Sequence, residues 1–275
     1  MTPEEIRRML HTDFARSLQK PFRAAVQEYR LIQPGDKIAV CISGGKDSML
    51  LALLMQDLQR TIAYTLVFLT MDAGFSEKTL EQIEATAEYF SLPLEIFHTN
   101  VLQVAQRHAG QHPCFLCSKM RRGYLYTEAQ KRGCHKIALG HHYDDAIETI
   151  LMGLLYGGQV QTMLPRLRAR RYPGMELIRP LYFIREKNVE DWATQCNITF
   201  PVCDCPARQL ENDTQRVKIR RLIGSLSEEN PQVPANIFNA VKNVDATKIL
   251  GWRDEAGRHS FLDQFSDDYV PPKGR

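Results

Sequence analysis

Residues 36–48 read Asp-Lys-Ile-Ala-Val-Cys-Ile-Ser-Gly-Gly-Lys-Asp-Ser, and a leucine-rich run follows them as far as residue 60. The apolar, β-branched segment from Lys37 to Ile42 predicts a buried strand. Ser43–Ser48 interrupts this pattern, and the leucines beyond it recur at helical spacing. The glycines allow the backbone to turn tightly and to approach a ligand closely. Amides at the start of the following helix, together with its dipole, then favour a negatively charged group.

The turn between this strand and helix carries several groups that suit a phosphate. Lys46 adds a cation, and the hydroxyls of Ser43 and Ser48 can donate hydrogen bonds. The turn is neither a Walker loop nor a G-x-G-x-x-G loop, because the spacing of its glycines and lysine differs from both. An ordinary tight turn with two glycines is the alternative interpretation. The candidate binding residues are Ser43, Gly44, Gly45, Lys46, Asp47 and Ser48.

Length and composition are those of an ordinary globular protein. The chain has 275 residues, 44% hydrophobic and 24% charged, with a net charge of +3. These values permit one large or two small domains, and a nucleic-acid partner has to be argued from local patches of charge. No apolar run reaches the roughly 18 residues of a membrane helix. The acidic start lacks the apolar core of a signal peptide, so we expect a cytoplasmic location and no membrane partner.

Strands and helices alternate along the first part of the chain. Beyond residue 158 the alternation is less regular, with a loop expected at 159–177 and a helix at 235–250. Short turns between strands and helices imply a parallel sheet covered on both faces, so we expect an α/β fold with a doubly wound, mostly parallel sheet. Further strands are expected at 64–71, 94–97 and 136–139, and helices at 76–90, 115–132 and 143–156.

Four regions are expected from this pattern. An N-terminal helical segment covers 1–33, with Pro21 separating two helical pieces. The domain that carries the candidate phosphate-binding turn covers 34–185. A C-terminal helical region covers 186–252, and the polar residues 253–275 are expected to form a flexible tail.

Carboxylates follow two of the predicted strands. Asp72 ends the strand at 64–71, where α/β sheets bind ligands. Gly140-His-His-Tyr-Asp-Asp145 lies where the strand at 136–139 meets its helix. The adjacent Asp144 and Asp145 can cap that helix, or they can hold Mg²⁺ together with phosphate oxygens. The two histidines are candidate metal ligands or packed side chains.

The cysteines form two groups of interest. Cys114 and Cys117 make a C-x-x-C pair at the head of a predicted helix, which suits a redox pair, half a zinc site or part of an iron–sulfur site. Cys203 and Cys205 lie some ninety residues further on. Four thiolates would make a structural zinc site, whereas three can hold a cubane cluster and leave one iron open. The other three are expected to be packed thiols, at Cys41, Cys134 and Cys196.

The motifs occur in an order that resembles one known family. They are Ser43–Ser48 (S-G-G-K-D-S), C-x-x-C-S-x-x-R-R-G at 114–123, G-H-H-x-D-D at 140–145, Y-G-G at 156–158, M-L-P at 163–165, I-R-P-L at 178–181 and Gln-Arg at 215–216. Over roughly residues 20–245 the chain resembles the tRNA 2-thiocytidine synthetases, also called tRNA-cytidine 2-sulfurtransferases, in the PP-loop ATP pyrophosphatase superfamily. The resemblance implies a PP-loop fold, related to the adenine nucleotide alpha hydrolases, with N- and C-terminal helical additions.

The resemblance also implies cofactors and site residues. The cofactors are ATP, Mg²⁺ on Asp145, and a [4Fe–4S] cluster. Two of the family's three cluster cysteines match Cys114 and Cys117. Counting back from Gln215-Arg216 places the third at Cys205, but C-D-C-P replaces the usual C-x-x-C there, so Cys203 remains an alternative. The implied catalytic residues are Asp145, Arg121 and Asp47, and the implied nucleotide-binding residues add Asp72 and Gly140.

The implied reaction is ATP-dependent tRNA thiolation. The C2 oxygen of a tRNA pyrimidine, most readily cytidine, is adenylated and then replaced by sulfur carried on the cluster. Implied partners are tRNA and a sulfur donor such as a cysteine desulfurase or free sulfide, and a homodimer is compatible with the sequence. Candidate phosphate contacts, each of which can also be a plain surface charge, are Arg166, Arg168, Arg170, Arg171, Lys218, Arg220 and Arg221.

Two other interpretations stay open at this point. A PP-loop tRNA-lysidine ligase would share the phosphate loop and the histidine–aspartate motif, but it would not need Cys114 and Cys117. A non-catalytic nucleotide- or RNA-binding protein with a structural Cys₄ zinc site would need the cysteines but no turnover. Metal content separates the three: iron, zinc or neither.

Overall fold

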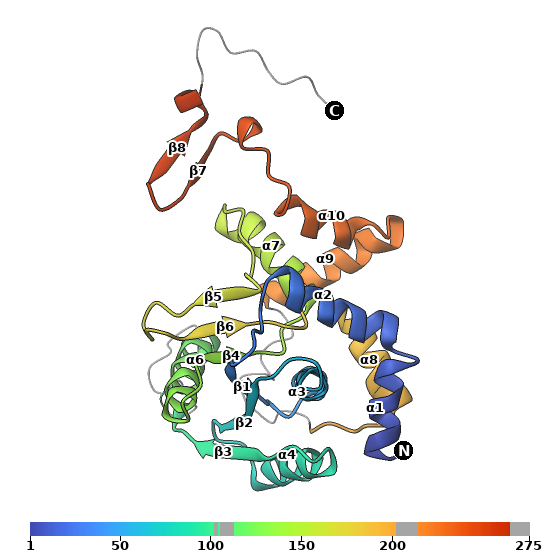
Figure 1. The fold of residues 1–275 in the computed structure, drawn as a ribbon. Helices are drawn as coiled ribbons and strands as arrows, with labels where there is room; N and C mark the ends of the chain where they lie inside the picture. The colour runs from blue at the N-terminus through green and yellow to red at the C-terminus, as the bar shows by residue number, and fades with distance from the viewer. Residues whose placement is uncertain (102–103, 105–112, 202–213, 265–275) are drawn as a thin grey trace.

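The core of the molecule is a twisted sheet whose strands run mostly parallel (Figure 1). The computed structural model describes residues 1–101, 104, 113–201 and 214–264. Within these residues the sheet order is β3-β2-β1-β4-β6-β5, with β5 antiparallel to β6 and the other pairs parallel. The strands are β1 Lys37–Cys41, β2 Thr65–Asp72, β3 Leu94–His98, β4 Lys136–Ala138, β5 Arg166–Arg168 and β6 Glu176–Ile178. The predicted α/β class and mostly parallel sheet are confirmed.

Successive side chains of the central strand β1 pack into two different hydrophobic cores on opposite faces of the sheet. Ile38 and Val40 of β1 enter one hydrophobic cluster, and Ala39 and Cys41 enter another on the opposite face. All four are buried. This is the period-2 alternation of a strand whose two faces are both covered, which explains why residues 37–42 are continuously apolar.

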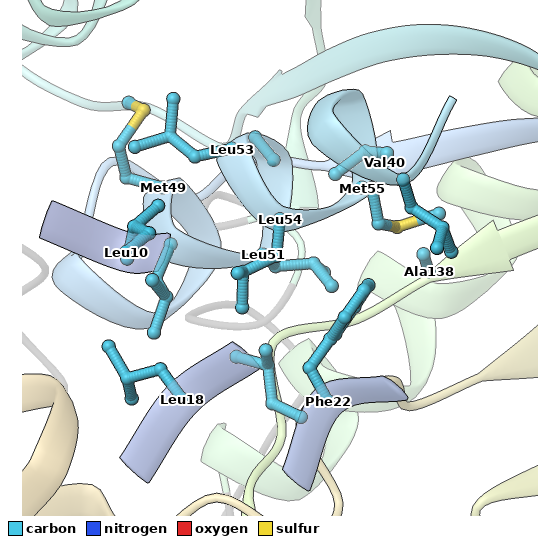
Figure 2. Packing of buried hydrophobic residues seen from close by; sticks show 14 of the residues in the cluster. Leu10, Leu18, Phe22, Val40, Met49, Leu51, Leu53, Leu54, Met55 and Ala138 are labelled. Carbon is cyan, nitrogen blue, oxygen red and sulfur yellow. The ribbon is translucent and has the colours of Figure 1, made fainter. Parts of the chain in front are cut away.

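The middle of the helix after β1 is buried, and its side chains pack against Leu10, Leu18 and Phe22 of the N-terminal helices (Figure 2). It is α3, Lys46–Leu58, and every residue from Met49 to Met55 is at most 1% exposed. α3 lies between the sheet and the N-terminal elements α1 (Pro3–His11), the π-helix Ala15–Gln19 and α2 (Lys20–Glu28), with α8 (Glu186–Gln195) and α4 (Glu77–Tyr89) completing this layer. Pro21 lies in the first turn of α2, which follows the π-helix directly, whereas α1 ends at His11, so the break between the N-terminal helices precedes Pro21.

The opposite face of the sheet packs against α6, Pro113–Lys131. Tyr126 and Ala129 of α6 join Leu69, Phe97 and Leu177 of the sheet in the second cluster. The head of α6 carries the C-x-x-C pair, so this helix brings the pair's backbone to the same side of the sheet as Arg121.

Three helices form a separate bundle beside the sheet. They are α7 (Tyr143–Gly157), α9 (Gln215–Glu229) and α10 (Val233–Ala240). Their shared core includes Ile147 of α7, Ile219 and Ile223 of α9, and Phe238 of α10. None of the helices in the described ranges combines the length and the apolar character that a membrane span requires.

Three predictions of local structure were wrong. The expected loop at 159–177 contains β5 and β6, which pair antiparallel at the sheet edge. The expected helix at 235–250 ends with α10 at Ala240. The expected tail begins with a hairpin of β7 (Gly251–Arg253) and β8 (Arg258–Ser260), and the Asp254 carboxylate accepts the amides of Ala256 and Gly257 in its turn. Such short elements depend on pairing partners and local side-chain bonds more than on periodicity.

Candidate active site

The predicted phosphate loop connects β1 to α3 and is held closed by hydroxyl groups. Ser48 Oγ accepts the amide of Ser43 at 3.1 Å and donates to the carbonyl of Gly45 at 2.9 Å. Gly44 has a φ of +86°, and a Cβ there would lie 2.7 Å from the side chain of Ile83. Glycine is therefore required at this position for both conformation and space. The loop leaves the amides at the start of α3 available for an anion.

Asp47 lies in the first turn of α3 with one oxygen unpaired. Its Oδ2 is 3.4 Å from Lys46 Nζ, but the buried Oδ1 has no hydrogen-bond partner among the described residues. Burial raises the pKa of Asp47 above its ordinary value, against the opposing effects of Lys46 and His142. A buried, unpaired carboxylate oxygen is costly, and a cation together with phosphate oxygens would satisfy it.

Gly140 brings the end of β4 against the phosphate loop. A Cβ at Gly140 would lie 3.1 Å from the amide nitrogen of Ser48 and 3.2 Å from the carbonyl carbon of Asp47. β4 is the neighbour of β1 in the sheet, so their carboxyl ends lie side by side. The strand order reverses at this point, which is where open α/β sheets bind ligands. The predicted residues of both motifs therefore belong to one site.

Asp145 faces this site from the first turn of α7. Its Oδ2 accepts the amide of His142 at 3.0 Å, and its Oδ1 is 2.9 Å from Arg216 Nη1. Burial would raise the pKa of Asp145, but His142, His141 and Arg216 outweigh it, so the pKa lies below its ordinary value. The carboxylate both caps α7 and stays ionised, so the cap and Mg²⁺ interpretations are compatible.

The neighbouring Asp144 points elsewhere. Its two oxygens lie 3.0 and 3.3 Å from Arg185 Nε, and its Oδ2 also accepts the amide of Glu186 at 2.6 Å. Asp144 thus fastens the start of α7 to the start of α8. The two adjacent carboxylates have different structural partners, and Asp145 is the one that contacts the groups of the site.

A chain of ion pairs surrounds Asp145, and its central member, Glu148, was not among the predicted site residues. Glu148 is 1% exposed, and its oxygens lie 2.9 Å from Arg216 Nη1 and 2.7 Å from Arg220 Nε. Glu186 extends the chain by lying 3.1 Å from Lys46 Nζ. Glu148 was identifiable only by its position one turn after Asp145, which places both on one helix face.

Three other predicted site residues, Asp72, Arg166 and Arg220, have partners within the protein. Asp72 ends β2, and its oxygens accept the amides of Gly74 and Phe75 and contact His98 Nδ1 at 2.8 Å. A role for Asp72 toward a nucleotide remains a prediction. Arg166 pairs with Glu176 at 2.9 Å, and Arg220 pairs with Glu148 as described, so these two arginines are engaged within the chain.

The residues expected to bind iron are described only in part. Arg121 lies on α6, where its charge acts against the burial that raises the pKa of the Cys41 thiol to about 12. Cys114 and Cys117 lie in the first turns of the same helix. Cys203 and Cys205 lie outside the described residues. The predicted packed thiols Cys41, Cys134 and Cys196 are all buried, which confirms that prediction.

Comparison with known proteins identifies the family. A model of the PP-loop domain matches residues 10–225. A tRNA-cytidine(32) 2-sulfurtransferase of Alkalilimnicola ehrlichii is 35% identical, covering 82% of this chain and 72% of that protein. One from Anaeromyxobacter dehalogenans strain 2CP-1 is 33% identical, covering 94% of this chain and 93% of that protein. The chain belongs to the tRNA-cytidine 2-sulfurtransferase family of PP-loop proteins.

A solved structure supports the same fold for this PP-loop protein. The U34-tRNA thiolase NcsA from Methanococcus maripaludis, solved with its [4Fe–4S] cluster, superposes with a TM-score of 0.66. It is 19% identical and covers 82% of this chain and 79% of its own. The turn Ser43–Ser48 between β1 and α3 is called the PP-loop below.

The PP-loop site fits ATP with a divalent cation. A glycine cradle, free helix amides and Lys46 suit phosphate oxygens, and the unpaired Oδ1 of Asp47 suits a cation. Within the described residues no group of three or more His, Cys, Asp or Glu side chains is arranged for a metal ion. Any cation at this edge would therefore rely on phosphate oxygens for the rest of its ligands, as Mg²⁺ usually does.

Proposed function

We propose that this protein is an ATP-dependent tRNA sulfurtransferase that adenylates the C2 oxygen of a tRNA cytidine and replaces it with sulfur. Membership of the sulfurtransferase family supports the substrate class. The structural observation that carries the proposal is the close approach of Gly140, at the start of the motif that contains Asp145, to Asp47 and Ser48 of the PP-loop. By analogy with its relatives, the target is cytidine 32.

The first step forms a bond from the C2 oxygen to the α-phosphorus of ATP. The bond between this phosphorus and pyrophosphate breaks, and the charge on the leaving pyrophosphate grows. The amides at the start of α3 and the ammonium of Lys46 stabilise that charge in the PP-loop. Asp47 and Asp145 would hold Mg²⁺, which neutralises charge on the phosphates when it is bound.

The second step replaces the activated oxygen. Sulfur attacks C2, the bond from C2 to oxygen breaks, and AMP leaves with that oxygen, so no net oxidation occurs. A [4Fe–4S] cluster on Cys114, Cys117 and Cys205 would supply the sulfur as sulfide when bound. Arg121 is proposed to act on this step because α6 carries both Arg121 and the first two of these cysteines. A target base in a tRNA loop can leave its stack at low cost.

The test measures pyrophosphate release in anaerobic protein with ATP, Mg²⁺ and tRNA. Ser43→Ala and Asp47→Ala are expected to abolish release, because the first removes a loop hydroxyl and the second removes the unpaired carboxylate. Their iron content should equal that of the wild type, at about four irons per chain if the cluster is complete. Ser225→Ala, on the exposed surface of α9, serves as the control. Unchanged release in both site variants would contradict the proposal.

A further inference from the structure

Arg179 is a buried arginine that forms no ion pair within the described part of the protein. It follows β6 directly and is 5% exposed. Its Nη1 donates a hydrogen bond to the carbonyl of Leu164, whereas its buried Nε has no partner among the described residues. In the described ranges, no carboxylate lies within ion-pair distance of this guanidinium.

A second unpaired group lies on the neighbouring strand connection. His141 follows β4, and its Nδ1 is buried without a hydrogen-bond partner in the same described ranges. β4 and β6 are paired in parallel register, Ala138 opposite Ile178, so His141 and Arg179 leave the sheet at the same edge. His141 and Arg179 each interact electrostatically with Asp145, and Arg179 influences the ionisation of His141. The two orphan groups are therefore neighbours beside Asp145.

Arg179 carries its positive charge at a buried position. Burial lowers the pKa of Arg179 to about 10, so the guanidinium remains a cation at neutral pH. A buried cation without an ion-pair partner is costly, and a protein usually offsets that cost by pairing or by binding an anion. The hydrogen bond to the carbonyl of Leu164 satisfies only one of the five N–H donors of a guanidinium.

We propose that Arg179 and His141 form a subsite for the α-phosphoryl group of the nucleotide, distinct from the PP-loop that receives pyrophosphate. This inference rests on the proposed function. The α-phosphoryl group must lie between the pyrophosphate and the target base, and Arg179 follows a strand beyond β4, on the side of the PP-loop where Asp145 lies. A guanidinium can bind two oxygens of a phosphate at once, and an imidazole can add one hydrogen bond.

The subsite would act in both chemical steps. The α-phosphoryl oxygens keep their charge while pyrophosphate leaves, and that charge increases when AMP departs with the C2 oxygen. A fixed guanidinium in a buried setting stabilises such charge without reorganising. Its small exposure also favours the nucleotide over a backbone phosphate of the RNA, which would approach from the surface.

Separate titrations of AMP and of pyrophosphate test the proposal, measured calorimetrically on the full chain. In Arg179→Met, AMP affinity is expected to fall about tenfold or more, while pyrophosphate affinity stays within about twofold. Arg60→Met is the matched control, because Arg60 is a 76% exposed arginine just beyond the far end of α3. Unchanged AMP affinity, an equal loss of pyrophosphate affinity, or a loss confined to binding of an RNA stem-loop would each overturn the subsite.

A conservative variant distinguishes a loss of phosphate binding from a folding defect. Arg179→Lys keeps a cation but loses the two-oxygen geometry, so AMP affinity is expected to fall about threefold or more with pyrophosphate binding retained. Full AMP affinity in this variant would overturn the proposal even if Arg179→Met does not fold. A wild-type protein that binds neither ATP nor pyrophosphate would instead contradict the proposed function, so the two failures are distinguishable.

Discussion

Asp144 and Asp145 are adjacent in sequence but are used differently by the fold. Asp144 accepts hydrogen bonds from Arg185 and from the amide of Glu186, and so joins α7 to α8. Asp145 caps its own helix with one oxygen and meets Arg216 with the other. A cation at the site would compete with Arg216 for that second oxygen. We therefore expect one carboxylate to serve stability and the other to serve the reaction.

The variants Asp144→Asn and Asp145→Asn are expected to separate these roles. Asp145→Asn should reduce pyrophosphate release about a hundredfold or more, because a carboxamide does not supply the charge that Mg²⁺ requires. Asp144→Asn should retain most activity and lose about 1–2 kcal/mol of stability through its weaker bond to Arg185. Turnover assays and urea unfolding measure the two effects. Full activity with bound Mg²⁺–ATP in Asp145→Asn would reduce this carboxylate to a helix cap.

At the scale of elements, one buried acid adds ion pairs to the hydrophobic packing of α9 on α7. Glu148 binds both Arg216 and Arg220, and it is almost inaccessible to solvent. Glu148→Gln is expected to destabilise the protein by about 3 kcal/mol, because it leaves two arginines beside a neutral amide. Urea unfolding of the full chain measures this change. The pyrophosphate-release activity should fall as well, since Arg216 also contacts Asp145.

A double-mutant cycle shows whether the cost comes from the ion pair itself. Arg220→Met removes the second partner of Glu148 and keeps much of the length of the side chain. If the pair is the source, Glu148→Gln should cost less in the Arg220→Met background than in the wild type, by about 1 kcal/mol or more. Strict additivity of the two substitutions would contradict a direct coupling between Glu148 and Arg220.

The elements differ in how well their sequences predicted them. The PP-loop was predictable because strand, turn and helix are contiguous, and the glycine at position 44 meets a local demand for positive φ. The Glu148 interactions were not, because their partners lie about seventy residues away and only the packing of α9 on α7 brings them together. The sequence likewise does not show that Arg220 pairs with Glu148, so Arg220 was only a candidate phosphate contact. β5 and β6 are too short to show a period of their own.

At the scale of the whole molecule, the two edges of the sheet contrast in how their buried charges are paired. At the carboxyl edge, Asp47 and Arg179 retain polar atoms that no described residue pairs. At the amino edge, buried Asp36 contacts Lys136, which is 3% exposed, and lies 2.8 Å from His135 Nε2. Unpaired buried groups are tolerated where a ligand can satisfy them, and fully paired ones serve the fold.

Asp36 should make stability depend on pH. Burial opposes ionisation, but the hydrogen bonds from Lys136 and His135 outweigh it and lower the pKa of Asp36. A lowered folded-state pKa gives stability that is present at neutral pH and is lost as the pH falls through that value. Asp36→Asn is expected to cost about 3 kcal/mol at pH 7, and the difference from wild type should shrink below about pH 4. Unfolding measured across this range would contradict the prediction if the difference stayed constant.

The proposed cluster depends on two segments that are distant in sequence. Cys114 and Cys117 are one helical turn apart on α6, a spacing at which two thiolates can share one metal cluster. Cys205 is the predicted third ligand from its distance to Gln215-Arg216, and it precedes α9, whose Arg216 contacts Asp145. In sequence, Cys205 therefore lies shortly before the helix that contacts the proposed adenylation site.

Cysteine variants of the anaerobic protein test this arrangement. Cys114→Ala, Cys117→Ala and Cys205→Ala are each expected to lose iron and the brown thiolate-to-iron absorbance, whereas Cys203→Ala should keep both. Three ligands leave one iron open for sulfur, so the number of cysteines is part of the proposed reaction. Loss of iron in Cys203→Ala with retention in Cys205→Ala would exchange the two assignments. Loss in both would indicate four thiolate ligands, which would close the open iron and remove the route for sulfur transfer.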